Sequence, residues 1–311
     1  MTFIKKSVTF IFIVVCFSCK ITKNSNDKKE PKVAYLAAYM KAKDEKHMYY
    51  AIATDTFLFK EINNGKPILS ASFDDKLIRD PMVFQDQNGV YHMVATVSWK
   101  NRPLTVWDSN DLIHWENERL VDVAPKNASK TWAPELAYDE ENDLYFIYWT
   151  AEINNEWKTA SIYYATTKDF IKFSEPKVLY SDDNDGILDA NIIKVNGLYK
   201  LIYRKNGIWV ASSKNALGPY SDSYQLTKEN VEGPYAFHLN NSNEFGITWD
   251  YYRGNNGFGL LISSDFENWN RVTNQKKPYY NENVEFPEGI RHGSIIGITQ
   301  KELDSLLIVF K

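Results

Sequence analysis

Three acidic residues, Asp80, Asp189 and Glu232, each stand where a polar or turn-forming stretch gives way to a short apolar strand. Carboxylates held close together repel one another, and this repulsion spreads their pKa values. One carboxylate can then accept a proton at a pH where another is still protonated and can donate one. The pattern therefore predicts acid–base catalysis. The alternative, that each carboxylate only caps a turn, is weakened because the three positions are equivalent.

Two further stretches have the same polar-to-apolar character, around Pro134 and His292. The five stretches are residues 78–84, 132–138, 188–193, 232–237 and 291–296. Taken at Asp80, Pro134, Asp189, Glu232 and His292, they lie 43–60 residues apart, a period typical of propeller blades. Because the inner strands of a propeller begin around its axis, we expect the carboxylates to meet there.

The rest of the chain from residue 33 onward predicts an almost wholly β fold. Short aromatic and β-branched runs alternate with Asn, Asp and Gly, and only residues 301–307 have a clear helical pattern. A second element rich in Ser, Thr and Asp recurs at residues 53–57, 107–112, 165–170, 211–215 and 262–266. We interpret it as the turn between the two outer strands of a blade, with a following aromatic residue packed between blades.

The two ends of this pattern complete one another. The first copy of the turn has no inner strand before it, and the last inner strand has no outer strands after it. Residues 33–62 would therefore supply the outer strands, and residues 291–298 the inner strand, of one shared blade. The prediction is an all-β domain over residues 33–311, a five-bladed β-propeller closed by N-terminal strands that pair with the C-terminal inner strand. An open β-sandwich array would leave both incomplete ends unexplained.

Five motifs in this order resemble glycoside hydrolase family 43. They are Asp80-Pro81, Trp132-Ala133-Pro134-Glu135, Leu188-Asp189-Ala190, Glu232-Gly233-Pro234 and Arg291-His292-Gly293. The resemblance covers residues 33–299 and implies a five-bladed propeller with an inverting mechanism. It implies that Asp80 is the general base, that Asp189 tunes acidity and that Glu232 is the general acid.

The resemblance also implies roles for neighbouring residues. Trp132 would be a wall on which a sugar stacks, with a buried core tryptophan as the alternative, and Glu135 would join the substrate-binding group. Arg291 would bond a sugar hydroxyl or hold Asp189 ionised. His292 would contact a central water or a calcium ion held mostly through water, with a structural histidine as the alternative. No cofactor is expected to be required.

The function implied is an exo-glycosidase that removes pentose residues, α-L-arabinofuranose first and β-D-xylose second, from plant polysaccharides. Exo-galactosidase and endo-arabinanase activities are the alternatives within the family. A non-catalytic carbohydrate-binding propeller is the alternative of another class. The loops at residues 99–103, 151–158 and 250–257 would decide the preferred sugar and linkage.

The N-terminus predicts export. Lys5 and Lys6 precede an apolar run and then Ser18-Cys19, so residues 1–18 are expected to be a signal peptide. Cys19 would be the lipidated first residue of a bacterial lipoprotein in the periplasm, outer membrane or cell surface, and residues 19–32 a flexible tether. With 36 basic and 40 acidic residues the net charge is −4, which suggests no nucleic-acid partner. The partners expected are a polysaccharide or oligosaccharide and the membrane, with the protein a monomer.

Overall fold

The strands expected from the alternating aromatic and polar runs are present throughout the part of the chain that the structure describes. The computed structural model describes residues 30–54, 56–73, 77–100, 103–253, 257–273 and 283–311. The predicted signal peptide, Cys19 and nearly all of the predicted tether lie outside these residues. No helix among the described residues is long and apolar enough to cross a membrane.

Four successive four-stranded antiparallel sheets occupy the middle of the described chain. The first has β6 (Arg79–Gln85), β7 (Tyr91–Thr96), β8 (Leu104–Ser109) and β9 (Glu116–Val121). The second has β10 (Ala128–Asp139), β11 (Leu144–Ile153), β12 (Glu156–Thr167) and β13 (Lys177–Tyr180). The third has β14 (Leu188–Val195), β15 (Leu198–Arg204), β16 (Ile208–Ser213) and β17 (Ser221–Thr227). The fourth has β18 (Glu232–His238), β19 (Phe245–Asp250), β20 (Phe258–Ser263) and β21 (Asn270–Arg271).

A further sheet joins the two ends of the described chain. Its order is β23 (Ile290–Thr299), β1 (Lys32–Lys41), β2 (Asp44–Ala53) and β4 (Lys60–Glu61), and β5 (Leu69–Ser70) also pairs with β2. The register of β1 against β23 runs from Lys32 opposite Thr299 to Lys41 opposite Ile290. β3 (Phe57–Leu58) pairs in parallel with β22 (Val284–Glu285) beside it.

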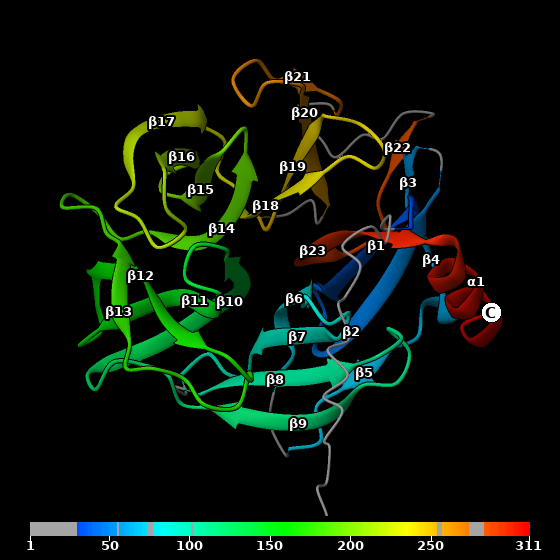
Figure 1. Ribbon diagram of the computed structural model, residues 1–311, viewed down its shortest axis with the longest axis horizontal. Helices are drawn as coiled ribbons and strands as arrows, with labels where there is room; N and C mark the ends of the chain where they lie inside the picture. The colour runs from blue at the N-terminus through cyan, green and yellow to red at the C-terminus, as the bar shows by residue number, and fades with distance from the viewer. Residues whose placement is uncertain (1–29, 55, 74–76, 101–102, 254–256, 274–282) are drawn as a thin grey trace, which may run out of the picture. The chain divides into compact units, whose positions relative to one another are not determined.

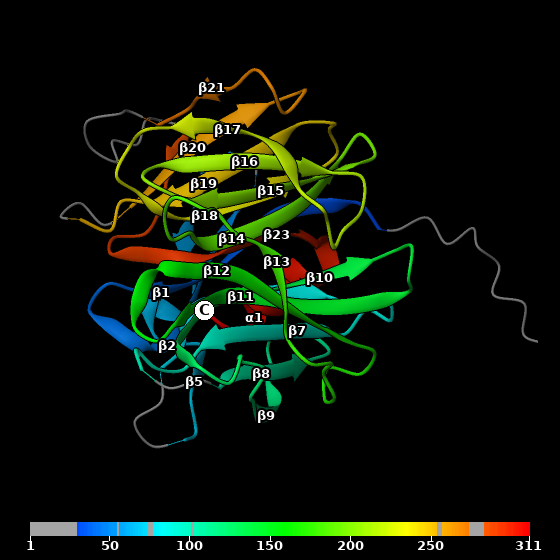
Figure 2. The same cartoon turned by 90° about the vertical axis from the view of Figure 1, so that its left-hand side faces the viewer.

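The five inner strands form a closed ring. β6 contacts β10, β10 contacts β14, β14 contacts β18, β18 contacts β23, and β23 contacts β6. Figure 1 shows these strands around the centre, and the later strands of each sheet lie progressively outward, as β14 to β17 do in both Figures 1 and 2. The predicted all-β five-bladed propeller is confirmed.

Four of the inner strands share one irregularity, which lies at the start of β6, β14 and β18 and further along β10. The pairing register shifts just after Arg79, Trp132, Leu188 and Glu232. At each shift one residue has a left-handed backbone: φ is 52° at Asp80, 48° at Ala133, 52° at Asp189 and 57° at Gly233. A β-bulge of this kind redirects the side chains of the strand that carries it. Asp80 and Asp189 therefore sit on equivalent, specifically bent backbone.

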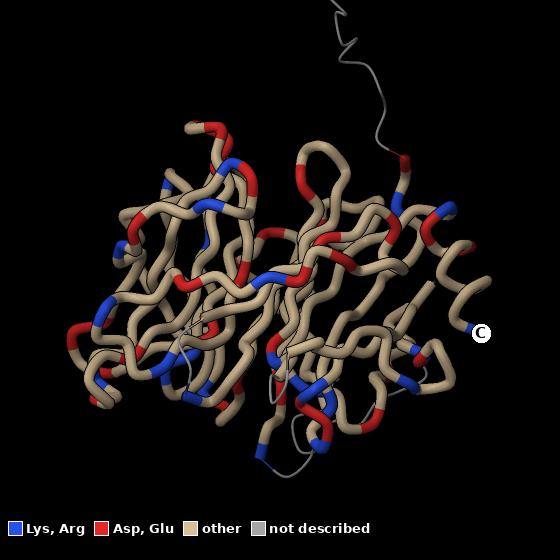
Figure 3. The backbone as a smooth tube through the Cα atoms, turned by 90° about the horizontal axis from the view of Figure 1, so that it is seen from below, with Lys and Arg blue, Asp and Glu red and all other residues tan. Residues whose placement is uncertain are grey.

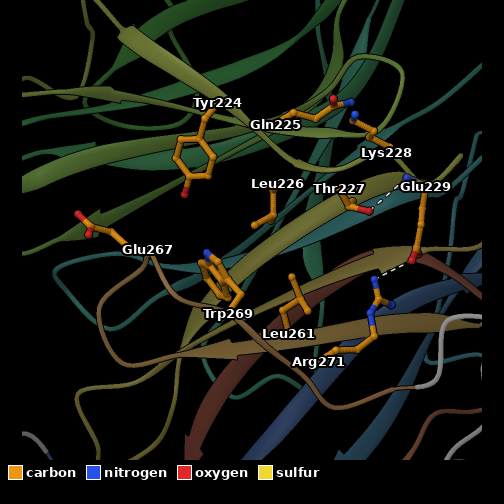
Figure 4. A pocket seen from close by; sticks show the side chains of 10 residues that line it. All are labelled: Tyr224, Gln225, Leu226, Thr227, Lys228, Glu229, Leu261, Glu267, Trp269 and Arg271. Carbon is orange, nitrogen blue, oxygen red and sulfur yellow. Dashed lines mark hydrogen bonds and ion pairs between the residues drawn. The ribbon is translucent and has the colours of Figure 1, made fainter.

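The repeated Ser/Thr/Asp element is the turn between the two outer strands, as predicted. In three copies an aspartate carboxylate accepts two backbone N–H groups, and the residue after it has a positive φ; these copies contain Asp111, Asp169 and Asp265. The aromatic that follows packs between blades. Trp115 donates to the hydroxyl of Tyr50 in the neighbouring sheet, and Trp269 lines a cavity of about 830 Å³ between β17 and β21 (Figure 4).

The predicted helical segment forms α1 (Gln300–Val309). Thr299 caps this helix. Its hydroxyl accepts a hydrogen bond from the backbone N–H of Glu302, and the Glu302 carboxylate accepts one from the backbone N–H of Thr299. Leu303 and Leu306 are the buried residues of the helix.

Lys and Arg residues are interspersed with Asp and Glu over the described backbone (Figure 3).

Candidate active site

The three predicted carboxylates meet where the inner strands β6, β14 and β18 begin around the ring axis (Figure 1). Asp80 and Asp189 are only 8% and 5% exposed. Asp80 Oδ1 lies 3.3 Å from His292 Nδ1, and Asp189 Oδ2 accepts the amide of Gly233, the residue after Glu232, at 3.0 Å. Side chains from three blades thus form one cluster.

Asp80 is held as an ionised carboxylate. Thr96 donates its hydroxyl to Asp80 Oδ2 at 2.8 Å. Burial acts to raise the pKa of Asp80, but the positive charge of Arg79 and the contacts from His292 and Thr96 outweigh burial and hold this pKa well below its usual value. A buried carboxylate of this kind carries its negative charge at neutral pH.

The pKa of Glu232 is shifted in the opposite direction, upward. Burial is the largest cause, and the negative charges of Asp189 and Asp250 add to it, raising the pKa of Glu232 to about 7 against the opposing charge of Arg291. The Glu232 side chain is 20% exposed, which leaves it accessible at the cluster's surface. It can therefore be a protonated acid at a pH where Asp80 is ionised.

Asp189 interacts electrostatically with both of these groups. Burial raises its pKa most; the charge of His292 opposes the rise and the charge of Asp80 adds to it. Its bond to the Gly233 amide fixes it against the backbone that carries Glu232. The arrangement of an ionised base, a protonated acid and a third carboxylate is the one that acid–base catalysis at a single pH requires.

His292 is a buried cation at the centre of the cluster. Burial acts to lower its pKa, but the bond to Asp80 and the charges of Asp80, Asp189 and Glu135 raise it to about 9. Among the described residues no three His, Cys, Asp or Glu side chains are arranged to hold a metal ion directly. A calcium ion held mostly through water, with His292 at its periphery, stays a prediction.

Arg291 is expected to bond a sugar hydroxyl or to hold Asp189 ionised. Its protein partners are other carboxylates: its Nη2 donates to Glu232 Oε1 at 2.6 Å and its Nε donates to Asp250 Oδ2. A bond to a sugar hydroxyl stays a prediction. Asp250 was predicted to lie in a rim loop. It is instead the last residue of β19 and is fully buried, so sequence reasoning missed a fourth carboxylate of the cluster.

Glu135 of β10 lies behind these residues. Its side chain is buried, and Asn191 Nδ2 donates to its Oε2 at 3.0 Å. Burial raises the pKa of Glu135 to about 8, against the opposing hydrogen bonds from Asn191 and Tyr148. At neutral pH this group is a buried carboxylic acid that joins β10 to β14. Its part in substrate binding stays a prediction.

Two tryptophans contact one another near Arg79, the residue before Asp80. Trp132 is half-buried, and its ring meets the edge of Trp99 with the ring centroids 6.1 Å apart. Trp99, the first residue of the loop at 99–103 that is expected to help decide the preferred sugar, is 49% exposed but fixed on two sides. The guanidinium carbon of Arg79 lies 3.5 Å from the centroid of the Trp99 ring, and Trp99 Nε1 donates a hydrogen bond to Glu45 at 3.1 Å. An exposed indole held in place offers the flat apolar surface on which sugar rings stack.

Gly233 gives a test of how tightly the cluster is built. Its φ is +57°, and a Cβ placed there would lie 2.7 Å from His292 Cγ. Gly233→Ala should destabilise the protein by about 1–3 kcal/mol through strain and overpacking, and lower activity by displacing Glu232. The control is Gly197→Ala, where φ is +82° but no atom lies within 4 Å, so only backbone strain is added. Thermal melts compare them; equal losses in both variants would contradict contact with His292.

Comparison with known proteins identifies the family to which the chain belongs. Residues 30–304 match the family model described as "Probable glycosyl hydrolase domain", which is related to glycoside hydrolase family 43. An α-L-arabinofuranosidase of Bifidobacterium longum subsp. longum is 23% identical over 340 residues. That match covers 80% of this chain and 31% of the relative, so the chain spans about a third of its length.

Solved structures share the fold. The α-L-arabinofuranosidase of Lactobacillus brevis matches with a TM-score of 0.51 and 18% identity over 65% of this chain and 75% of that chain. The exo-β-1,3-galactanase of Phanerochaete chrysosporium matches with a TM-score of 0.52 and 10% identity over 63% of this chain and 50% of that chain. Because the family model covers nearly the whole propeller, the chain belongs to the family-43-related glycosyl hydrolases.

Proposed function

We propose that this protein is a glycosidase that removes terminal pentose residues, α-L-arabinofuranose in preference to β-D-xylose, from plant polysaccharides or oligosaccharides with inversion at the anomeric carbon. The observation that carries the chemistry is the opposite displacement of two pKa values within one cluster, lowered at Asp80 and raised to about 7 at Glu232. The arabinofuranosidase match over 80% of the chain supports the choice of sugar.

The mechanism follows from the two protonation states. Asp80 accepts a proton from a water molecule while the water oxygen forms a bond to the anomeric carbon. The bond between that carbon and the departing oxygen breaks, and Glu232 gives its proton to this oxygen. Asp80 ends protonated and Glu232 ionised, and exchange with solvent restores both. Because water attacks from the face opposite the leaving group, the product has the inverted configuration.

Trp99 and Trp132 form the proposed sugar-stacking wall. Trp99→Ala should raise KM by roughly 2- to 12-fold with little change in kcat, because an aromatic contact of this kind is worth about 0.5–1.5 kcal/mol. Trp99→Phe keeps an aromatic face and should recover part of the loss. Steady-state kinetics on an arabino-oligosaccharide measure both variants. A fall in kcat with KM unchanged would mean that Trp99 instead supports Asp80 through Arg79.

An exo-galactosidase is the second candidate, because structures of a similar fold include an exo-β-1,3-galactanase. A panel of nitrophenyl α-L-arabinofuranoside, β-D-xyloside and β-D-galactoside separates the two. We expect the arabinofuranoside to have the highest kcat/KM. A preference for the galactoside would favour the second candidate. Turnover of none of them, nor of arabinan or galactan oligosaccharides, would overturn the proposed substrates.

A further inference from the structure

Asp250 is a buried carboxylate without a role in the mechanism above. It ends β19 directly opposite Glu232 in the register of β18 and β19 and is 0% exposed. Its Oδ2 accepts the Nε of Arg291 and, at 3.1 Å, the backbone amide of His292. Its Oδ1 is buried and has no hydrogen-bond partner among the described residues. Such a group is costly to bury, so its place beside the acid calls for an explanation.

One guanidinium serves both carboxylates. Arg291 donates its Nη2 to Glu232 at 2.6 Å while its Nε is held by Asp250. Two carboxylates around one positive charge, away from water, cannot both be fully stabilised as anions, so one of them retains a proton more readily.

We infer that Asp250 is a positioning residue that competes with Glu232 for Arg291 and so keeps Glu232 protonated for transfer to the leaving group. The inference rests on the proposed function, in which Glu232 is the acid. Asp250 is fully buried and bonds both Arg291 and a backbone amide, whereas the more exposed Glu232 bonds Arg291 through one oxygen.

Other charges also face Glu232. They are Asp189 of β14, and Arg291 and His292 of β23. Asp80 of β6 and Arg204 of β15 act in turn on Asp189, and Arg79 of β6 acts on Asp80. Burial raises the pKa of Asp250 to about 6 despite Arg291, and the pKa of Glu232 to about 7. Burial thus acts against ionisation of both carboxyls, and the charge of Arg291, which opposes this rise at each of them, is shared between the two.

The test is Asp250→Asn, which keeps the shape and an oxygen that can accept from Arg291 and His292. Removing the negative charge leaves the guanidinium to Glu232, so the pKa of Glu232 should fall by about one unit or more. ¹³C NMR of protein labelled at the glutamate carboxyl carbon, with the Glu232 signal assigned by its loss in Glu232→Gln, measures this midpoint without any turnover. An unchanged midpoint in a folded variant would overturn the inference.

Activity gives an independent readout. The alkaline limb of kcat/KM should move to lower pH in Asp250→Asn, with a larger loss on oligosaccharides than on nitrophenyl glycosides. In a Glu232→Gln background the same substitution should leave the pH profile unchanged, and an equal shift there would overturn the inference.

Asp139→Asn is the matched control. Asp139 is also buried, but it ends the inner strand β10, where its carboxylate accepts hydrogen bonds from the backbone N–H of Glu141 and from Asn142 Nδ2. It should leave the limb in place.

If Asp250→Asn does not fold, Arg291→Met tests the same competition with the opposite sign. Glu232 then loses its cation while Asp250 stays beside it, so the midpoint of Glu232 and the alkaline limb should both rise. A fall or no change would overturn the inference. Failure of the wild-type protein to turn over any glycoside, with the NMR midpoint shifted as expected, would reject the proposed substrates and leave the competition established.

Discussion

Asp80→Asn should lower kcat by about 10²–10⁴-fold on nitrophenyl glycosides and oligosaccharides alike, the range typical of a lost general base. The base activates water whatever group departs, so the leaving group should make no difference. Although burial alone would favour its protonated form, Asp80 is ionised because Arg79, His292 and Thr96 outweigh burial. Asparagine is neutral and cannot accept the proton from water.

This substitution should spare the fold. Asp80 has a φ of 52°, a conformation that asparagine also tolerates, and the Thr96 hydroxyl can still donate to an amide oxygen. Thermal melts check this point. Azide should restore turnover of an aryl glycoside by replacing the activated water, and the product should be a glycosyl azide of inverted configuration. Retention of more than about a tenth of wild-type kcat would contradict the assignment, because loss of a base costs at least about 10²-fold.

Glu232→Gln should separate substrates by their leaving group. A nitrophenolate departs without a proton, whereas a sugar alkoxide does not, so the loss should approach about 10²–10⁴-fold on oligosaccharides and be far smaller on nitrophenyl glycosides. The variant should also lose the alkaline limb. Wild-type activity falls as pH rises through the pKa of Glu232, about 7, because only the protonated form below that pH can donate.

Parallel pH–rate profiles on both substrate types check this prediction. Equal losses on the two would mean that Glu232 binds or positions the substrate instead of protonating the leaving group. An alkaline limb that persists in Glu232→Gln would assign that limb to another group; Glu135, whose pKa burial raises to about 8, is the obvious one to examine.

The inner strands were predictable because each begins with the same change from polar to apolar residues. This repeat predicted Asp80, Asp189 and Glu232 at equivalent positions. The structure brings the three together, with Asp80 and Asp189 at matching positions and Glu232 one residue earlier in its strand, before Gly233. The turns between outer strands were predictable for a similar reason. Their aspartates bond backbone groups only two or three residues away, so the signal is local in sequence.

Asp250 and Trp99 each begin a loop that was expected to help decide the preferred sugar. The burial of Asp250 and the fixed ring of Trp99 were missed because their surroundings come from distant parts of the chain. Asp250 precedes a Tyr-Tyr-Arg-Gly stretch that resembles a loop, and its burial depends on the register of β18 against β19 and on Arg291 from β23. Trp99 follows β7 in a polar stretch, and its ring is fixed by Arg79, Glu45 and Trp132. Neither the strand register nor the contacts between blades can be predicted from the local sequence pattern.

The bulges at the inner strands were also hidden. A left-handed backbone is readily adopted by glycine, so Gly233 could have indicated it, but the same conformation at Ala133 has no sequence signal. The hydrogen-bond partners of Arg291 near the axis could not be predicted from the sequence either. Arg291 could have reached several carboxylates, and only the structure shows that it lies between Glu232 and Asp250.

The configuration of the first product tests the central claim most directly. The claim is that Asp80 activates water on one face of the sugar while Glu232 protonates the departing oxygen on the other. ¹H NMR of a hydrolysis mixture, recorded within the first turnovers and before mutarotation, resolves the two anomers. The account predicts that the inverted anomer appears first. A retained anomer would contradict it, because one of the carboxylates would then attack the sugar as a nucleophile.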